Sequence, residues 1–198
     1  MAKLYLTHNF VQNRTCGDCV MCCKVLGIED AEFSKPAGVL CGHCTGTGCG
    51  IYDVRPTTCR TFFCLWRRVE GLADHARPDL TGVIFTLEGQ KNPANPFDWL
   101  HIVGRADGAD QAAYAAPAVQ EQLDLFKGEG TLPVFLNEGG QKRLVYPEAE
   151  LVDAIWNPET TPHQHLRPRA EAWVQRYERF VAAFWEERDR AEAAGKAA

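Results

Sequence analysis

The spacing of apolar and polar residues predicts an α+β fold for the second part of the chain, residues 69–198. Residues 80–88 and 98–105 are rich in β-branched and aromatic side chains, which predicts two strands. Residues 133–147 contain two shorter runs of this kind, separated by a Glu-Gly-Gly sequence that favours a hairpin turn. We therefore expect an antiparallel sheet with helices packed against it.

Two segments of the same region have the spacing of helices. Residues 110–127 predict one helix, although Pro117 should kink or split it. Near the C-terminal end, apolar side chains recur every three or four positions, and charged side chains occupy the opposite face. We expect this long amphipathic helix to pack on the sheet, with binding of a protein partner as the alternative. Its apolar positions are Ala170, Trp173, Val174, Tyr177, Phe180, Val181, Phe184 and Trp185.

Residues 1–68 have a different pattern and are expected to form a cysteine-rich, turn-rich region, on or near which residues 69–198 pack. Residues 16–26 predict a short helix that stops at Gly27. Residues 36–56 contain too many glycines and prolines for a long helix or strand, so we expect their cysteines on tight turns. The cysteines that would share one stripe of the short helix are Cys16, Cys19 and Cys23.

The composition is that of an ordinary globular protein, with 45% hydrophobic and 24% charged residues and a net charge of −5. Residues 1–68 carry eight basic and five acidic side chains, whereas residues 69–198 carry thirteen and twenty-one. The small basic excess of residues 1–68 could offset the negative charge of metal-bound thiolates. It is weaker than the basic stripe of a nucleic-acid-binding protein, so we do not expect nucleic-acid binding. No apolar run is long enough for a signal peptide or a membrane span, so we expect a cytoplasmic protein.

All nine cysteines lie between Cys16 and Cys64. Core packing does not explain such a concentration, and in a reducing compartment thiols bind metals more often than they form disulfides. The odd number of cysteines also argues against a disulfide framework. The sequence therefore predicts that thiolates bind zinc or iron, the latter in an iron–sulfur cluster as one form. The predicted ligands are Cys16, Cys19, Cys22, Cys23, Cys41, Cys44, Cys49 and Cys59.

The spacing of these ligands is compatible with two kinds of centre. Two C-x-x-C pairs, which begin at Cys16 and Cys41, could together hold one tetrahedral zinc ion. The C-x-x-C-x-x-C run that ends at Cys22 instead has the spacing of three ligands of an iron–sulfur cluster. A remote thiolate such as Cys59 would complete that cluster. Spacing alone leaves zinc and iron as equal alternatives.

Nine sulfur atoms exceed the needs of one four-ligand ion, so the number of metal sites stays open between one, two and a polynuclear centre. Cys64 stands in the apolar sequence FFCLW and is expected to be a spare core thiol. His43 lies inside the second C-x-x-C pair and is the alternative ligand, although a histidine in such a loop usually points away. Arg55 and Arg60 are expected to lie beside the site and to offset the charge of the thiolates.

Residues 14–68 resemble the YkgJ-like cysteine-cluster proteins, which are described as carrying a zinc- or iron-chelating CxxCxxCC domain. The resemblance rests on the opening C-x-x-C-x-x-C-C, on the later Cys44 and Cys49, and on the string IYDVRPTTCRTF over residues 51–62. It implies that these cysteines chelate a metal. Some relatives with this cluster look like iron–sulfur proteins linked to protein-lysine methylation, but this chain has no obvious Gly-rich turn for adenosylmethionine.

The leading hypothesis is a metal-binding protein, and the metal decides its class. Zinc would make the region a structural or interaction module without catalysis, because a closed four-sulfur site has no open coordination position. An iron–sulfur cluster would favour a redox or methylation-associated enzyme. No hydrolase, P-loop or dinucleotide motif is present, so catalytic residues are not predicted. His163 and His165 are expected to be solvated loop residues.

Overall fold

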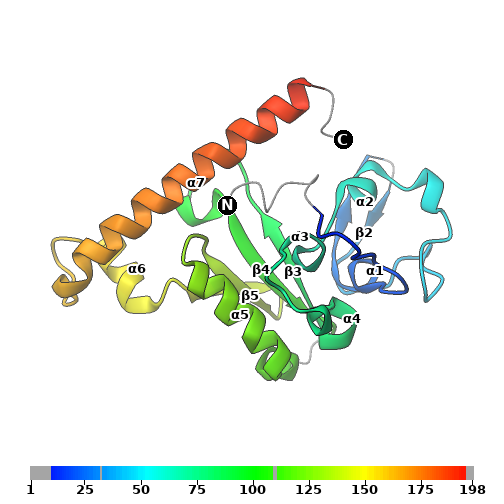
Figure 1. Cartoon of the computed structure of the whole chain (residues 1–198), viewed down its shortest axis with the longest axis horizontal. Coiled ribbons are helices and arrows are strands. Elements are labelled where there is room, and N and C mark those ends of the chain that lie inside the picture. Colours follow the sequence, from blue (N-terminus) through cyan, green and yellow to red (C-terminus); the bar gives the residue numbers. More distant parts are fainter. Residues whose placement is uncertain (1–9, 32, 109–110, 195–198) are drawn as a thin grey trace.

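The computed structural model describes residues 10–31, 33–108 and 111–194, and it confirms the α+β fold class (Figure 1). The α-helices are α1 (Met21–Val25), α2 (Thr57–Thr61), α3 (Leu65–Arg68), α4 (Pro78–Thr81), α5 (Pro117–Glu129), α6 (Ala149–Trp156) and α7 (Arg167–Ala193). The strands are β1 (Ile28–Glu29), β2 (Ser34–Lys35), β3 (Val83–Glu88), β4 (His101–Ala106), β5 (Val134–Glu138) and β6 (Gln141–Tyr146). The 3-10 turns are η2 (Tyr52–Val54), η3 (Asp74–Ala76), η4 (Pro96–Asp98), η5 (Gln111–Ala115) and η6 (Gln164–Leu166).

The main sheet has the strand order β3-β4-β5-β6 and is mixed rather than antiparallel. The β3–β4 and β5–β6 pairs are antiparallel as expected, but β4 and β5 run parallel, with Val103 opposite Phe135. The expectation of a wholly antiparallel sheet is therefore wrong at its centre. The physical reason is the helical connection between these strands. Helix α5 returns the chain to the end of the sheet at which β4 began, so β5 runs in the same direction as β4.

Both predicted strands begin later than expected. Pro78 starts the short helix α4, and Gly82, with φ +70°, ends it, so β3 begins only at Val83. Asn95 caps η4 through its side chain, and β4 follows at His101. In each case a short turn of helix occupies residues that composition assigned to a strand.

The helix predicted over residues 110–127 is also shifted. Pro117 is the first residue of α5 rather than a kink within it, because the first turn of a helix does not need the missing N–H of proline. Residues Gln111–Ala115 form the separate turn η5, and Gly130, with φ +63°, ends α5. The predicted hairpin is confirmed: Gly139 and Gly140 both have positive φ, as a two-residue turn requires.

The apolar face of α7 lies in the core of the protein. Trp173 and Tyr177 are almost fully buried and stack with ring centres 5.1 Å apart. The Tyr177 hydroxyl accepts the Leu100 N–H at 3.1 Å and lies 2.8 Å from the carbonyl of Pro96, so it joins α7 to the turn before β4. The packing prediction for this helix is thus confirmed, and its apolar stripe is used within the chain. No helix in the described ranges is long and apolar enough to cross a membrane.

The cysteine-bearing segments form a lobe at one end of the sheet, which we call the cysteine lobe (residues 16–63; Figure 1). The lobe contacts the sheet where Met21 and Val25 of α1 pack against Ile84 of β3. Just before the lobe, the Arg14 side chain donates to the carbonyls of Trp66, Val69 and Leu72 around α3. Apolar packing and this arginine together fix where the lobe begins.

A partly buried charge network lies on the sheet around Glu88, the last residue of β3, and His101, the first residue of β4. Glu88 pairs with Arg105 and Lys142, and Lys142 Nζ lies 2.8 Å from His101 Nε2. Burial opposes ionisation of Glu88, but the hydrogen bond and charge of Arg105 and the charge of Lys142 outweigh it and lower the pKa to about 2. Burial and the charge of Lys142 lower the pKa of His101 from 6.5 to about 4.

These shifts predict a loss of stability in mild acid. Between about pH 6.5 and 4 the unfolded chain takes up a proton on His101 that the folded chain does not, so the free energy of unfolding should fall by about 1.4 kcal/mol per pH unit. The contribution of Glu88 should be lost only at lower pH, from 4.5 toward about 2. Urea denaturation over this pH range measures both effects. His101→Gln should reduce the dependence of the free energy of unfolding on pH between about 6.5 and 4. The same change at the exposed His165 should leave that dependence in place.

Candidate metal centre

The first two cysteines precede helix α1 rather than lie on it. Cys16 and Cys19 flank a turn that is closed by the Cys19 N–H donating to the Cys16 carbonyl at 3.0 Å. Gly17 in this turn has φ +55°, a left-handed conformation that a helix does not contain. Only Cys22 and Cys23 lie on α1, so the predicted helix from residue 16 is wrong, and the predicted stripe of three sulfurs is not formed by it.

The second C-x-x-C pair forms a tight turn, as expected. The Cys44 N–H donates to the Cys41 carbonyl at 3.0 Å, and the Gly46 N–H donates to the Cys44 sulfur at 3.5 Å. Gly46 has φ +91°, which lets the backbone curl back over that sulfur. Cys44 also pairs with Cys49 in an isolated β-bridge. An N–H bond to sulfur favours the thiolate, which is the form that binds a metal.

Five cysteines from three segments gather around this turn. The Cys41 N–H donates to the Cys23 carbonyl at 3.0 Å, and the Cys23 thiol lies near the thiols of Cys22 and Cys44, which both affect its pKa. Cys59 on α2 lies within electrostatic range of Cys23, Cys41 and Cys49. We call Cys23, Cys41, Cys44, Cys49 and Cys59 the knuckle set.

Crowding of the thiols makes ionisation in the knuckle set unfavourable without a cation. The hydrogen bond from Cys22, with burial second, raises the pKa of Cys23 far above its ordinary value. Burial, and then the negative charges of three other knuckle cysteines, raises the pKa of Cys59. A bound cation would reverse this effect, since opposite charge favours the ionised form.

Three of the remaining four cysteines lie beside the sheet. Cys19, Cys22 and Cys64 pack against the apolar contact between α1 and β3. Burial raises the pKa of Cys64 to about 11, and negative charge on Cys16 and Cys19 adds to the increase. Cys64 therefore lies close to these two cysteines, which are 48 and 45 positions earlier in the chain. We call Cys16, Cys19, Cys22 and Cys64 the junction set.

Of the two arginines predicted beside the site, Arg55 affects a thiol directly. Its guanidinium lies 3.7 Å from the centre of the Tyr52 ring and donates to the Tyr52 carbonyl at 2.9 Å. Its positive charge lowers the pKa of Cys59, against the larger effect of burial. Arg60 donates to the hydroxyl of Thr57 at 2.9 Å within its own helix.

Lys35 is a functional candidate that the sequence did not reveal. Its side chain is buried, and its ammonium donates to the carbonyls of Leu26, Pro36 and Val39. Its charge favours the thiolate of Cys23. Lys35 thus shapes the loop that leads to the second C-x-x-C turn and supplies countercharge. A single lysine beside a proline carries no sequence signal of this role.

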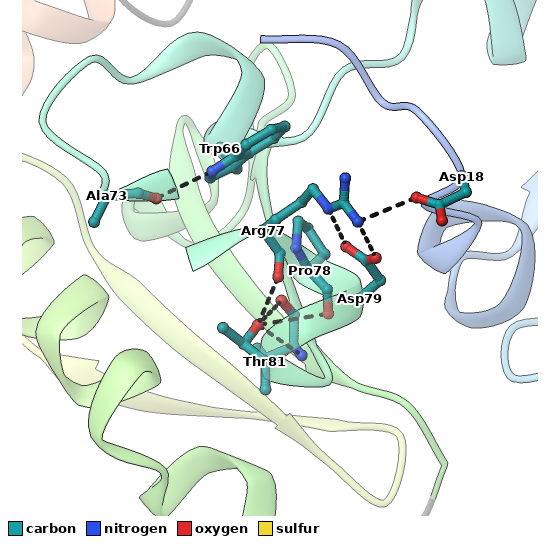
Figure 2. Close-up of polar contacts among 8 residues, drawn as sticks. Asp18, Trp66, Ala73, Arg77, Pro78, Asp79 and Thr81 are labelled. Carbon is teal, nitrogen blue, oxygen red and sulfur yellow. Dashed lines mark hydrogen bonds and ion pairs between the residues drawn. The ribbon is translucent and has the colours of Figure 1, made fainter. Parts of the chain in front are cut away.

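An ion-pair chain anchors the first cysteine turn to α4 (Figure 2). Arg77 donates two hydrogen bonds of 2.7 Å to Asp79 and one of 3.1 Å to Asp18, which lies between the first two cysteines. Burial, and in smaller part the nearby Asp79 carboxylate, raise the pKa of the Cys19 thiol. The predicted alternative ligand, His43, is exposed, and its ring lies 5.5 Å from the Phe33 ring, measured between centres.

The chemistry of the donors suits a thiophilic metal. All nine cysteines carry free thiols, and only Cys16 is fully exposed. Within the residues that the structure describes, no three Cys, His, Asp or Glu side chains are already close enough together to hold an ion. Comparison of the chain with family models, with curated proteins and with solved structures gives no match.

The role of Lys35 generates a prediction. Lys35→Met should leave three carbonyls without their donor and destabilise the cysteine lobe by roughly 3 kcal/mol, since each buried group that loses its partner is penalised. Faster amide hydrogen exchange over the loop that leads to the C-x-x-C turn would measure this. Lys24→Met is the matched control, because the half-exposed Lys24 ammonium pairs with Asp107 at the surface, where such pairs contribute about 0–1 kcal/mol. Equal exchange in both variants would contradict the assigned role.

Proposed function

We propose that this chain is a metal-binding protein that chelates zinc or iron through the thiolates of its cysteine lobe. The observation that carries the proposal is the turn at Cys41 and Cys44, where a backbone N–H donates to sulfur while Cys23 and Cys59 approach from separate helices. Thiols that come together from distant segments with N–H partners are the usual setting of structural metal sites.

The small apolar core of the lobe supports the same proposal. Among its described residues, the buried apolar side chains are those of Met21, Val25, Ile28 and Pro56. A unit of this size with so little apolar burial needs a crosslink or a metal to hold one conformation. Its helices are five residues long and its two strands have two residues each, so regular hydrogen bonding contributes little.

Zinc is the metal that suits the knuckle set best. Its C-x-x-C turn lies in an exposed loop, and zinc does not require protection from water or oxygen because it has no redox chemistry. Zinc bound there would close a tetrahedral site and make the lobe an interaction module without catalysis. The resemblance of residues 14–68 to YkgJ-like proteins supports chelation, and an iron–sulfur redox or methylation-associated enzyme is the second candidate.

Metal analysis of protein purified without oxygen tests the proposal. The protein should contain zinc, iron or both, and Cys44→Ser should lose most of the knuckle metal because it removes a ligand and the acceptor of the Gly46 N–H. Thr47→Ser, in the same loop, is the control and should keep it. Wild-type protein without either metal, or with its sulfurs joined as disulfides, would overturn the proposal.

Removal of the metal should unfold the lobe and spare the sheet. Binding free energy at such sites is largely folding free energy. A chelator should therefore speed amide hydrogen exchange across residues 16–63 by several orders of magnitude, while β3, β4 and β5 keep their protection, because their buried residues form the main core. Unchanged exchange in the lobe after the metal has been removed would contradict a structural role.

A further inference from the structure

Strand β6 is the open edge of the main sheet. It stands last in the strand order β3-β4-β5-β6, and among the described residues no backbone hydrogen bond from any element other than β5 reaches it. The opposite edge strand, β3, is instead contacted by helices α1, α3 and α4. An uncovered edge strand presents N–H and C=O groups that can pair with a further strand.

The hairpin turn determines which backbone groups of β6 face outward. Glu138 and Gln141 flank the two-residue turn, so they form the first hydrogen-bonded pair, and such pairs alternate along an antiparallel ladder. Arg143 therefore bonds to β5 as well. The N–H and C=O groups of Lys142 and Leu144 point to the open edge, where a partner strand could use them.

The basic side chains of β6 do not guard this edge. Charged side chains, lysine above all, often protect an edge strand from pairing. Lys142 instead bonds to Glu88 and His101 over the face of the sheet, and Arg143 bonds to Glu138 of the neighbouring strand at 2.6 Å. Both cations are thus used within the sheet, which leaves the outward backbone groups for a partner.

A hollow of about 400 Å³ borders β6 on the side of helix α5. It lies on the face of the sheet that carries Arg143, and Lys127 of α5 lines it. No acidic side chain among the described residues forms an ion pair with Lys127. The other charged groups that line the hollow, Arg143 and Glu148, are both paired within the chain. The hollow therefore keeps one uncompensated positive charge, which favours an acidic partner side chain.

A second hollow, of about 360 Å³ and mainly apolar, borders β6 on the side of helix α6. Leu144 lines it, and the side chain of Leu144 points to the opposite face from that of its neighbour on the strand. Trp156 of α6 also lines it and is 48% exposed, yet its ring packs on Phe97 with ring centres 5.5 Å apart. An exposed tryptophan held in one position is typical of a binding hot spot.

We propose that β6 binds an extended segment of a partner protein as a fifth strand of the sheet. Side chains of a strand alternate between its two faces, so the segment would place acidic side chains at the first hollow and apolar side chains at the second. This interaction goes beyond metal binding and does not depend on it. Symmetric pairing of two copies through β6 fits less well, because β6 carries two basic residues and no acidic one.

Hydrogen exchange of the full chain, with a short peptide of alternating leucine and glutamate as the probe, tests strand addition. The peptide should slow exchange of the N–H groups of Lys142 and Leu144 by at least roughly tenfold. The N–H groups of Gln141 and Arg143, which are already bonded to β5, should change little. Binding without this alternation, or no binding, would overturn the proposal.

Two modified peptides test the backbone bonds from the partner side. One carries N-methyl groups on every leucine and the other on every glutamate. Because the N–H groups of a strand point alternately to its two edges, one of these peptides should lose binding and the other should keep it. Equal affinity of the two methylated peptides would exclude strand addition.

Variants of the two hollows test the chemistry of the segment. Lys127→Glu should weaken the leucine–glutamate peptide roughly fivefold and strengthen a leucine–lysine peptide, since attraction becomes repulsion. Lys91→Glu, which lines neither hollow, is the control and should change neither affinity by more than about twofold. Trp156→Ala should weaken both peptides, whereas Leu80→Ala, at another exposed site, should weaken neither.

The remaining outcomes are distinct from failure of the proposed function. Wild-type affinity in both Lys127→Glu and Trp156→Ala would show that the hollows are not the binding surface. A dimer of the chain that protects Lys142 and Leu144 without any peptide would make a second copy the occupant and overturn the proposal. Metal content should be the same in all these variants, and urea denaturation should show that each is folded.

Discussion

Two buried cations hold together the irregular part of this protein. Arg14 and Lys35 each donate to three backbone carbonyls, and they do so where the chain has almost no regular secondary structure. Buried carbonyls must be paired, and a short strand or a five-residue helix pairs few of them. A long cationic side chain can satisfy several at once. The positions of the cysteine turns depend on this hydrogen bonding as well as on apolar packing.

The sheet and the cysteine lobe are therefore stabilised by different forces. The sheet is covered by aromatic and aliphatic side chains, among them Phe85, Phe126 and Trp173, and burial of this kind is the dominant stabilising term. The lobe has a small apolar contact with β3, one arginine anchor and a chain of ion pairs through Arg77. Its thiols are the groups there that best bind a crosslinking soft metal ion, which is why the proposed function concerns them.

The sequence predicted those helices and turns whose conformation is determined by neighbouring residues along the chain. Gly139 and Gly140 specify their turn because both need positive φ, and the periodic apolar residues specify α7. The parallel pairing of β4 with β5 has no local signal, since it depends on where α5 carries the chain. The cysteine spacing likewise identified candidate ligands but not where the fold places each of them. Their positions depend on the turn at Gly17, on the short helix α1 and on the packing of residues far along the sequence.

The position of Cys64 has a consequence for any attempt to study the lobe in isolation. Its neighbour Leu65 is fully buried in the main core, so Cys64 is held in place by the sheet rather than by the lobe. A fragment ending at residue 68 would contain all nine cysteines but not the strands that fix the last of them. A boundary at residue 68, where the composition changes, would therefore separate Cys64 and Leu65 from the strands that they pack against.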